Sequence, residues 1–311
     1  MGKGKKSMRK RVSVISVVYN QVEVTLDLLQ SLSEQEYRLL EIIIVDNGST
    51  ENTSVLKSKY PEIKLIRSKE NLGFAGGNNL GIKAAKGHYL FFVNNDTIIP
   101  KGTISSLVDN FSNTVDAGMM CPLIAYYDQP NTLQYAGATE INPWTGRNNA
   151  TGYRQQMQKS PKMMETSYAH GAALFTSRTL VKEIGSMPEN YFLYYEELDW
   201  AQSFRNAGYK IYVDHSSHIL HKESMSTGKS SPLKMYFQTR NRILFMKRNF
   251  RGPQLAAFFT FFVLLTIPKN ICKMLLKGRF DLLKAFFSGF LWHLKSPAYS
   301  GSASTSMPAF N

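Results

Sequence analysis

Three carboxylates stand close together in the second half of the chain, at Glu196, Glu197 and Asp199, in a segment that also holds five aromatic residues. Charges this dense beside aromatic side chains are unusual for a solvated surface. Crowded carboxylates raise the pKa of at least one of their number, which suits a general base. The alternative is structural, because acids also stabilise the positive end of a helix, here one expected over residues 198–207.

A metal site is indicated by two other parts of the chain. Asn94, Asn95 and Asp96 follow the apolar run 89–93, and His221 lies far downstream. One carboxylate together with a diphosphate holds Mg²⁺ or Mn²⁺, since these ions take few protein ligands and share phosphate oxygens. An imidazole ligand favours Mn²⁺ over Mg²⁺. Taken singly, each of these residues is more often structural.

Two segments near the N-terminus have features of a nucleotide site. Asp46 follows an apolar run, and a carboxylate there accepts a hydrogen bond from the ring N–H of uracil or thymine; alone, such a residue more often belongs to a turn or helix cap. Segment 71–79 carries three glycines, among them Gly73, which let a backbone approach a phosphate or ribose. Its spacing is not that of a dinucleotide-binding fingerprint, and it follows the third expected strand, not the first.

These residues need a scaffold, and the hydrophobic pattern predicts one. Apolar and β-branched runs predict strands, with helical spacing between them; the strands are expected at 12–19, 41–45, 64–67 and 89–93, and the helices at 24–32 and 80–85. This alternation implies a mostly parallel α/β sheet, which binds ligands at the carboxyl ends of its strands. Asn20, Asp46 and Asp96 stand at such ends. Beyond residue 119 shorter strands and loops follow, and we expect that half to face an acceptor.

Composition sets broad limits on the class of protein. The chain has 311 residues, 43% of them hydrophobic, enough for a substantial core. Its two cysteines, Cys121 and Cys272, are too far apart in sequence to suggest a disulfide framework or a zinc cluster, which favours a reduced, cytosolic setting. Residues 1–11 are basic but are not followed by the apolar stretch of a secretory signal.

The net charge of +14 is concentrated at the two ends of the chain. Residues 1–11 hold six basic residues and residues 222–311 hold fourteen, whereas residues 12–221 carry a net charge of −4. A protein that binds nucleic acid would interleave basic residues with aromatic ones on its sheet, so we expect no nucleic-acid partner. Basic ends fit an anionic membrane surface, and a solubilising role is the alternative.

The C-terminal region is rich in apolar residues. Residues 255–267 form an uncharged run that we expect to end at Pro268, too short for the roughly 20 residues that span a bilayer. A second apolar-rich stretch at 280–294 has basic residues around it. Basic residues beside apolar aromatic helices favour an interfacial anchor on an anionic leaflet, and a buried helical hairpin is the alternative. The Ser/Ala/Gly-rich tail 296–311 is expected to be disordered.

Six ordered motifs together resemble glycosyltransferase family 2, in particular its rhamnosyltransferase-like group in cell-surface polysaccharide synthesis. The motifs occupy residues 12–20, 43–50, 71–81, 92–96, 171–175 and 194–200. The resemblance implies a GT-A fold, a nucleotide-sugar donor (a dTDP- or UDP-sugar) and a Mn²⁺ or Mg²⁺ cofactor. It also implies an acceptor that is a glycan or a polyprenyl-diphosphate-linked sugar. Two positions depart from the family pattern: Asn94 replaces an aspartate, and Glu197 replaces the usual aspartate.

The resemblance also implies roles for individual residues. Glu197 takes the position of the base, with Glu196 and Asp199 as supporting acids. The metal would be held by Asp96 and His221, with Asn94 as a further candidate. Asp46 would read the base of the nucleotide, and the remaining donor-binding candidates are Tyr19, Asn20, Gly73, Asn78, Asn79, Asn95 and Arg240.

We therefore predict an inverting glycosyltransferase that is cytoplasmic and peripheral on the inner face of the cell membrane. The expected parts are a basic arm (1–11), a catalytic domain (12–250, with halves 12–118 and 119–250), a membrane-associating helical region (251–295) and a tail (296–311). The alternative is a catalytically inactive homologue that binds sugar nucleotides as a scaffold in glycan assembly, for which Asn94 is the main support.

Overall fold

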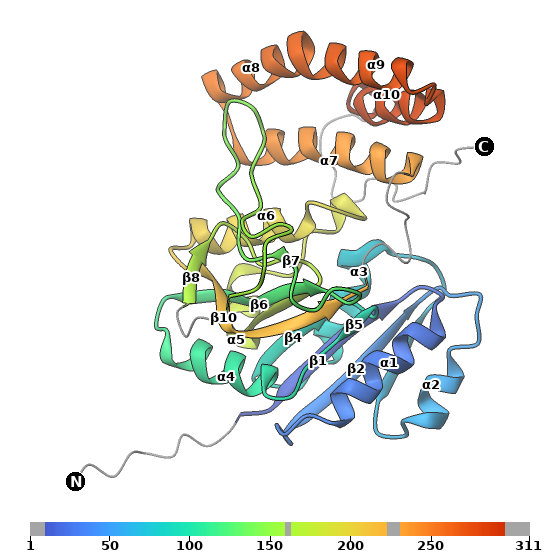
Figure 1. Ribbon diagram of the computed structural model, residues 1–311, viewed down its shortest axis with the longest axis vertical. Coiled ribbons are helices and arrows are strands. Elements are labelled where there is room, and N and C mark those ends of the chain that lie inside the picture. The colour runs from blue at the N-terminus through green and yellow to red at the C-terminus, as the bar shows by residue number, and fades with distance from the viewer. Residues whose placement is uncertain (1–9, 159–162, 223–230, 296–311) are drawn as a thin grey trace.

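The computed structural model describes residues 10–158, 163–222 and 231–295 (Figure 1). The tail 296–311 and nearly all of the basic arm lie outside these residues. The described strands form one ten-stranded sheet in the order β3-β2-β1-β4-β9-β6-β10-β5, with β7 beside β6 and β8 beside β10. They are β1 (Val12–Val18), β2 (Leu40–Asn47), β3 (Lys64–Ser68), β4 (Tyr89–Val93), β5 (Thr97–Ile98), β6 (Ala117–Tyr126), β7 (Leu133–Tyr135), β8 (Met163–Thr166), β9 (Ala173–Ser177) and β10 (Lys210–His221).

The N-terminal half of the sheet is parallel, as predicted. β1 pairs in parallel with β2 and β4, and β2 pairs in parallel with β3. Nearly every residue of β1 and all of β4 are buried. Strands covered on both faces need continuous apolar runs instead of alternation, and these two sequences supply them.

The C-terminal half makes the sheet mixed, so the prediction of a mostly parallel sheet holds only for the first half. β9 runs antiparallel to both of its neighbours, β4 and β6, whereas β6 and β10 are parallel. Antiparallel neighbours need no crossover helix, and the described residues between β6 and β9 contain none. The α/β class is confirmed.

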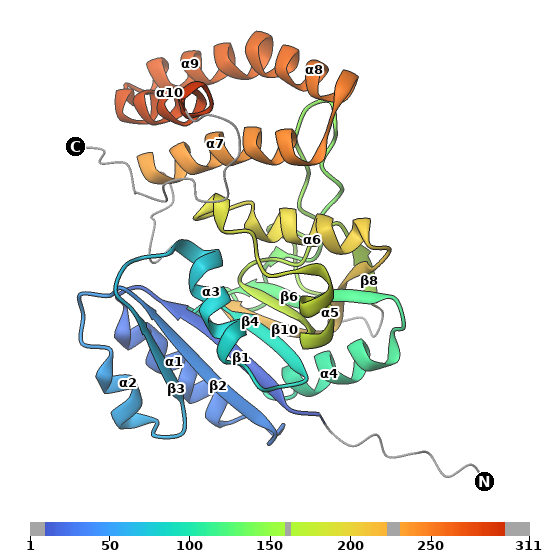
Figure 2. The ribbon, with the colours of Figure 1, turned by 180° about the vertical axis from the view of Figure 1, so that it is seen from behind.

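Helices cover both faces of the sheet (Figures 1 and 2). One face carries α1 (Val22–Ser33), α2 (Ser54–Lys59) and α4 (Thr103–Asn113), and the other carries α3 (Gly73–Ala84), α5 (Arg178–Ile184) and α6 (Glu196–Asn206). The carboxyl ends of the parallel strands are left open to a ligand, as expected for such a sheet.

The glycine-rich segment is mostly helical, so the helix expected at 80–85 begins earlier. α3 begins at Gly73, and two of its glycines, Gly77 and Gly81, lie against the sheet. A methyl group at Gly77 would lie 2.7 Å from Cγ1 of Val17, and one at Gly81 would lie 2.3 Å from Cγ2 of Ile15. Glycine is therefore required here for the close approach of helix and sheet, a constraint that the sequence alone does not distinguish from phosphate binding.

The C-terminal region is helical and is stacked above the sheet and its covering helices (Figures 1 and 2). It consists of α7 (Pro232–Asn249), α8 (Gly252–Phe261), a π-helical turn (Phe262–Thr266), α9 (Ile267–Leu276) and α10 (Phe280–Lys295). The helix that the apolar run forms does not stop at Pro268, contrary to the prediction, because Pro268 lies in the first turn of α9. The π-helical turn just before it accommodates the proline ring and its missing N–H.

The joined helix Gly252–Leu276 has 25 residues and is long and apolar enough to cross a membrane by length and composition alone. Only 17% of its most apolar window is buried, so most of it is not a core helix. Its inner face packs through Phe258 and Phe262, and the Phe262 ring stacks on Phe286 of α10. Its outer face exposes apolar side chains, among them Leu264 at 65%. The region thus combines hairpin-like packing with an uncovered apolar surface.

Candidate active site

A pocket of about 570 Å³ opens beyond the carboxyl ends of the parallel strands. Its walls come from the ends of β1, β4 and β10 and from the start of α6. Eight of the residues that the sequence singled out line this pocket together: Tyr19, Gly73, Asn94, Asn95, Asp96, Glu196, Glu197 and His221. The structure therefore brings the expected base and the expected metal ligands to one site.

Asp96 and His221 meet because two strand ends are paired. β5 runs antiparallel to the end of β10, which sets His221 opposite Thr97. Oδ1 of Asp96 lies 3.3 Å from Nε2 of His221, and Nδ2 of Asn94 lies 3.4 Å from the same nitrogen. This Asp96 oxygen is buried and makes no hydrogen bond within the described part of the chain. An oxygen and a nitrogen that converge in this way suit a divalent cation.

Gln134, which the sequence analysis missed, sets the tautomer of His221. Its Nε2 donates to the backbone oxygen of His221 at 3.1 Å, which turns its Oε1 toward Nδ1 of the same imidazole at 2.8 Å. Nδ1 therefore carries the proton, and Nε2 presents a lone pair toward Asp96. This arrangement fits a metal ligand. Because no group of three His, Cys, Asp or Glu side chains suited to a metal occurs among the described residues, a bound cation would rely on ligands from a substrate as well.

The two glutamates at the start of α6 are held in a buried environment. Burial raises the pKa of Glu197 to about 7. Burial, with the neighbouring charge of Glu197 adding to it, raises the pKa of Glu196 well above its usual range. Oε2 of each residue is buried and lacks a hydrogen-bond partner within the described residues. A carboxylate of raised pKa with an uncommitted oxygen in a pocket is suited to accepting a proton from a hydroxyl.

The backbone that leads into these glutamates is strained. Phe192, Tyr194 and Tyr195 have φ values of 67°, 69° and 78°. Left-handed conformations are uncommon for bulky side chains and cost about 1–3 kcal/mol each, so the surrounding structure must impose them. The constraint comes from α7: Nδ2 of Asn241 lies 3.0, 2.7 and 2.8 Å from the carbonyl oxygens of Tyr191, Leu193 and Tyr194.

Arg240 belongs to the same clamp and does not line the pocket, contrary to the prediction that it reaches a phosphate. Its guanidinium is buried, donates to the backbone oxygens of Asn190 and Tyr191, and lies 4.3 Å from the centre of the Trp292 ring. These carbonyl and aromatic contacts stabilise the buried guanidinium and occupy the groups that would otherwise bind a ligand.

Asp199 also has a structural place instead of the predicted supporting role beside the base. It is buried and pairs with Arg248 of α7 at 2.8 Å, and Nδ2 of Asn249 donates to its other oxygen at 2.6 Å. Glu197 and Asp199 are two positions apart on a helix, so their side chains do not share a face. Asp199 therefore ties α6 to α7.

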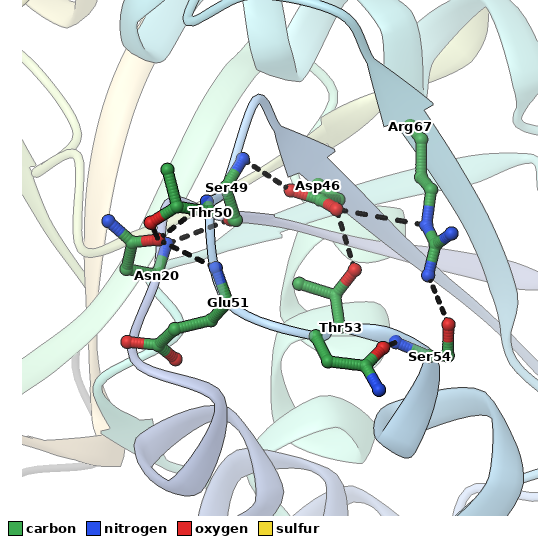
Figure 3. A network of polar contacts seen from close by, with 9 residues as sticks. Asn20, Asp46, Ser49, Thr50, Glu51, Thr53, Ser54 and Arg67 are labelled. Carbon is green, nitrogen blue, oxygen red and sulfur yellow. Dashed lines mark hydrogen bonds and ion pairs between the residues drawn. The ribbon is translucent and has the colours of Figure 1, made fainter.

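Asp46 and Asn20 form a polar network of their own (Figure 3). The two oxygens of Asp46 accept from Ser49 N at 2.9 Å and Thr53 Oγ1 at 2.6 Å, and Oδ1 of Asn20 accepts from Thr50 N at 2.9 Å. Neither residue lines the pocket, whereas Asn47 does, because neighbouring side chains of a strand point to opposite faces. Contact of Asp46 with a nucleotide base stays a prediction.

Asn78 and Asn79 are buried in α3 and lie away from the pocket lining. Asn78 donates to the carbonyl of Phe74 in its own helix, and Asn79 donates to the carbonyl of Met187 at 2.8 Å. Contact of these two residues with the nucleotide sugar stays a prediction. Their amides join α3 to the segment before α6.

His170 is a further pocket residue that the sequence analysis missed, since no motif marks it. Its Nδ1 accepts from the backbone N–H of Ala172 at 3.1 Å, which leaves the proton on Nε2. Burial lowers the pKa of His170 to about 3, so the ring stays neutral. It lines the pocket together with Tyr135 and Tyr168, and the centre of its ring lies 6.3 Å from the centre of the His221 ring.

The sequence profile described as "Glycosyl transferase family 2" matches residues 13–185. The chain belongs to this family. It is 26% identical over 270 residues to N-acetylglucosaminyl-diphospho-decaprenol L-rhamnosyltransferase of Mycobacterium tuberculosis (strain ATCC 25618 / H37Rv), covering 77% of this chain and 85% of that one. The predicted resemblance to the rhamnosyltransferase-like group is thereby confirmed.

Solved structures support the fold of this glycosyltransferase. The mannosyltransferase PcManGT from Pyrobaculum calidifontis, in complex with GDP-Man and Mn²⁺, superimposes with a TM-score of 0.59 at 16% identity, covering 93% of this chain and 88% of that one. S. aureus TarS 1–349 in complex with UDP-GlcNAc gives a TM-score of 0.54 at 20% identity, covering 90% and 81%. The predicted GT-A-type fold is confirmed.

The buried glutamate pair should make the glycosyltransferase less stable as the pH rises. A carboxyl group whose pKa is raised on folding contributes full stability below its unfolded pKa of about 4.3, and that contribution falls as the pH rises through the folded value. For Glu197 the folded value is about 7. Glu197→Gln should therefore melt like the parent protein at low pH and at a higher temperature at alkaline pH. The gain in the free energy of unfolding at alkaline pH should be on the order of 1–3 kcal/mol.

Thermal unfolding across this pH range checks the expectation. Exposed Glu36 offers the matched control, and Glu36→Gln should follow the parent protein at every pH. A Glu197→Gln protein that gains no stability at alkaline pH would show that burial does not raise this pKa.

Proposed function

We propose that this protein is an inverting glycosyltransferase that moves a sugar from a nucleotide-sugar donor to a hydroxyl group of an acceptor. The observation that carries the proposal is the position of Glu197, a carboxylate of raised pKa, in the same pocket as the Asp96–His221 pair. The name of the mycobacterial relative makes L-rhamnose our first choice of sugar, carried by dTDP, and a UDP-sugar the second.

The reaction is a single in-line displacement. The acceptor hydroxyl oxygen attacks the anomeric carbon of the donor, and Glu197 takes the hydroxyl proton as the new glycosidic bond forms. The bond between the anomeric carbon and the nucleoside diphosphate breaks, and the diphosphate leaves with the electron pair. The configuration at the anomeric carbon is inverted because the two oxygens occupy opposite faces of the sugar.

Mn²⁺ or Mg²⁺ would be held by Asp96 and His221, with the amide of Asn94 beside them, and would supply positive charge for the leaving diphosphate. The residues fit such a cation, since Gln134 presents the His221 lone pair and Oδ1 of Asp96 has no hydrogen bond. Asn94 adds no negative charge to the proposed cation ligands. The second candidate function is therefore that of a homologue that binds the donor without transferring its sugar.

The acceptor in this proposal is a glycan or a sugar linked to a polyprenyl diphosphate, in the synthesis of a cell-surface polysaccharide. Its support is the similarity to the mycobacterial relative, an N-acetylglucosaminyl-diphospho-decaprenol L-rhamnosyltransferase. The protein would work at the inner face of the cell membrane, held there by its C-terminal helices. Their exposed apolar side chains and neighbouring lysines are the features that such an interfacial anchor requires.

Glu197→Gln should lower the transfer rate by about 10²–10⁴-fold, because the variant has no base for the hydroxyl proton. Donor binding, measured by the shift in melting temperature with dTDP- and UDP-sugars, should stay near that of the parent protein. Glu197→Asp keeps a carboxylate and should retain more activity than Glu197→Gln. In the parent protein kcat/KM should rise with pH and level off above about 7, the pKa of Glu197. Turnover retained by Glu197→Gln would place the base elsewhere.

Asp96→Ala and Gln134→Leu should both weaken Mn²⁺ binding. The first removes a ligand, and the second removes the hydrogen bond that keeps the proton of His221 on Nδ1. Loss of a residue that orients a metal ligand typically costs about 10–100-fold in affinity. Titration of Mn²⁺ followed by electron paramagnetic resonance checks this without reference to activity. Gln129→Leu, at an exposed glutamine, is the control. Unchanged Mn²⁺ affinity in both variants would contradict the assignment of the cation to Asp96 and His221.

The full chain should bind phosphatidylglycerol vesicles more strongly than neutral phosphatidylcholine vesicles, because apolar burial and lysine charge act together. Changing Leu264 and Leu265 to glutamate, at two exposed positions in the π-helical turn, should reduce the bound fraction measured by co-sedimentation. A parent protein that remains wholly in the supernatant with phosphatidylglycerol vesicles would rule out the anchor.

A further inference from the structure

A second cavity, of about 270 Å³, lies between α7 and α9. Both helices turn one face toward it, since the lining residues recur at intervals of three and four positions. Its polar lining residues are Ser231, Lys234 and Gln238 in or just before α7, Asn270, Lys273 and Lys277 in or just after α9, and Arg279 just before α10. We call this cavity the basic groove.

The basic groove has a strong excess of positive charge. Lys234, Lys273, Lys277 and Arg279 line it, and its lining includes no carboxylate among the described residues. The nearby Asp281 forms a two-bond ion pair with Arg279, at 2.8 and 2.6 Å, and so offsets one of the four charges. Three lysines with amide and hydroxyl neighbours make a site for an anion that carries more than one charge.

The basic groove adjoins the active-site pocket. Lys234 lines both cavities, and its neighbour Leu233 lines the pocket. The Lys234 ammonium lies 5.8 Å from the centre of the Tyr194 ring, which is also part of the pocket wall. An anionic group in the groove could therefore be joined directly to a sugar in the pocket.

Apolar side chains are exposed near the other end of the groove. Leu276, at the end of α9, is 83% exposed, and Phe280, at the start of α10, is 65% exposed, close in sequence to the groove residues Lys277 and Arg279. Exposed apolar residues beside a cationic groove match a molecule with an anionic head and a hydrocarbon chain.

We propose that the basic groove binds the diphosphate of a polyprenyl-linked acceptor, with the polyprenyl chain over Leu276 and Phe280 and the first sugar in the pocket. This inference rests on the proposed function, and it assigns to Lys273 and Lys277 the role of binding the acceptor. The arrangement explains why three cations surround a cavity that is separate from the predicted donor and metal residues.

The test compares two double variants of the full chain. Lys273→Glu with Lys277→Glu reverses two charges in the groove. Lys269→Glu with Lys284→Glu reverses two charges at exposed positions of α9 and α10 that do not line it. Binding is measured to phosphatidylcholine vesicles that contain either a polyprenyl diphosphate or phosphatidylglycerol, matched for surface charge. The parent protein should prefer the polyprenyl diphosphate vesicles.

Both double variants should lose similar affinity for phosphatidylglycerol vesicles, because each removes the same general attraction. Only the groove variant should lose the preference for polyprenyl diphosphate, by about tenfold for two reversed charges. Equal binding of polyprenyl diphosphate by the two variants overturns the proposal. So does a parent protein without the preference, which would make the groove a sensor of general membrane charge.

Failure of this inference is distinguishable from failure of the proposed function. The melting-temperature shift caused by nucleotide sugars should be the same in the parent protein and in both double variants, since none of the changed lysines belongs to the predicted donor or metal residues. If the parent protein shows the melting-temperature shift with nucleotide sugars but no preference for polyprenyl diphosphate vesicles, only the assignment of the basic groove is wrong. If nucleotide sugars cause no shift in the melting temperature of the parent protein, the proposed function itself is wrong.

Discussion

The carboxylates of the active site depend on a backbone that its own residues do not favour. Phe192, Tyr194 and Tyr195 adopt left-handed conformations just before α6, and Asn241 and Arg240 of α7 hold the carbonyl groups of that segment. Released from these contacts, the segment would relax, and Glu197 would lose its direction into the pocket. The position of Glu197 is therefore determined by α7, which begins 35 residues further along the chain.

The same helix connects the catalytic domain with the C-terminal layer. One face of α7 binds the strained segment, another packs against α10, and the first turn carries Lys234, which lines both cavities. The ion pair between Asp199 and Arg248 fastens the far end of α7 to α6. Asp199 is buried and the Arg248 side chain is 31% exposed, so the loss of hydration offsets part of the attraction between the two charges. The direction of Glu197 and the packing of the C-terminal helices thus depend on one structural element.

Several residues look like ligands in the sequence and are structural in three dimensions. Gly77 and Gly81 of α3 allow close packing on β1, Arg240 donates hydrogen bonds to carbonyl groups, and Asp199 is paired with Arg248. Each of these residue types can either bind a ligand or hold the fold together. An arginine, for example, can donate to a ligand phosphate or to a carbonyl oxygen of the protein. Only the neighbours decide which partner is nearer. The continuation of the apolar helix through Pro268 is a similar case, since a π-helical turn accommodates the ring.

The sequence by itself determined the α/β class and the parallel half of the sheet. It also predicted that Asp46, Asp96, Glu197 and His221 meet at one cleft, and the pocket brings together the last three. Apolar strand runs fix which segments are buried, and parallel strands place their carboxyl ends at one edge. Only the tertiary structure decided the antiparallel insertion of β9, the tautomer that Gln134 imposes on His221, the neutral His170 in the pocket wall and the groove between α7 and α9. These features arise from contacts between residues far apart in the chain, and such contacts leave no local pattern for a reader of the sequence to recognise.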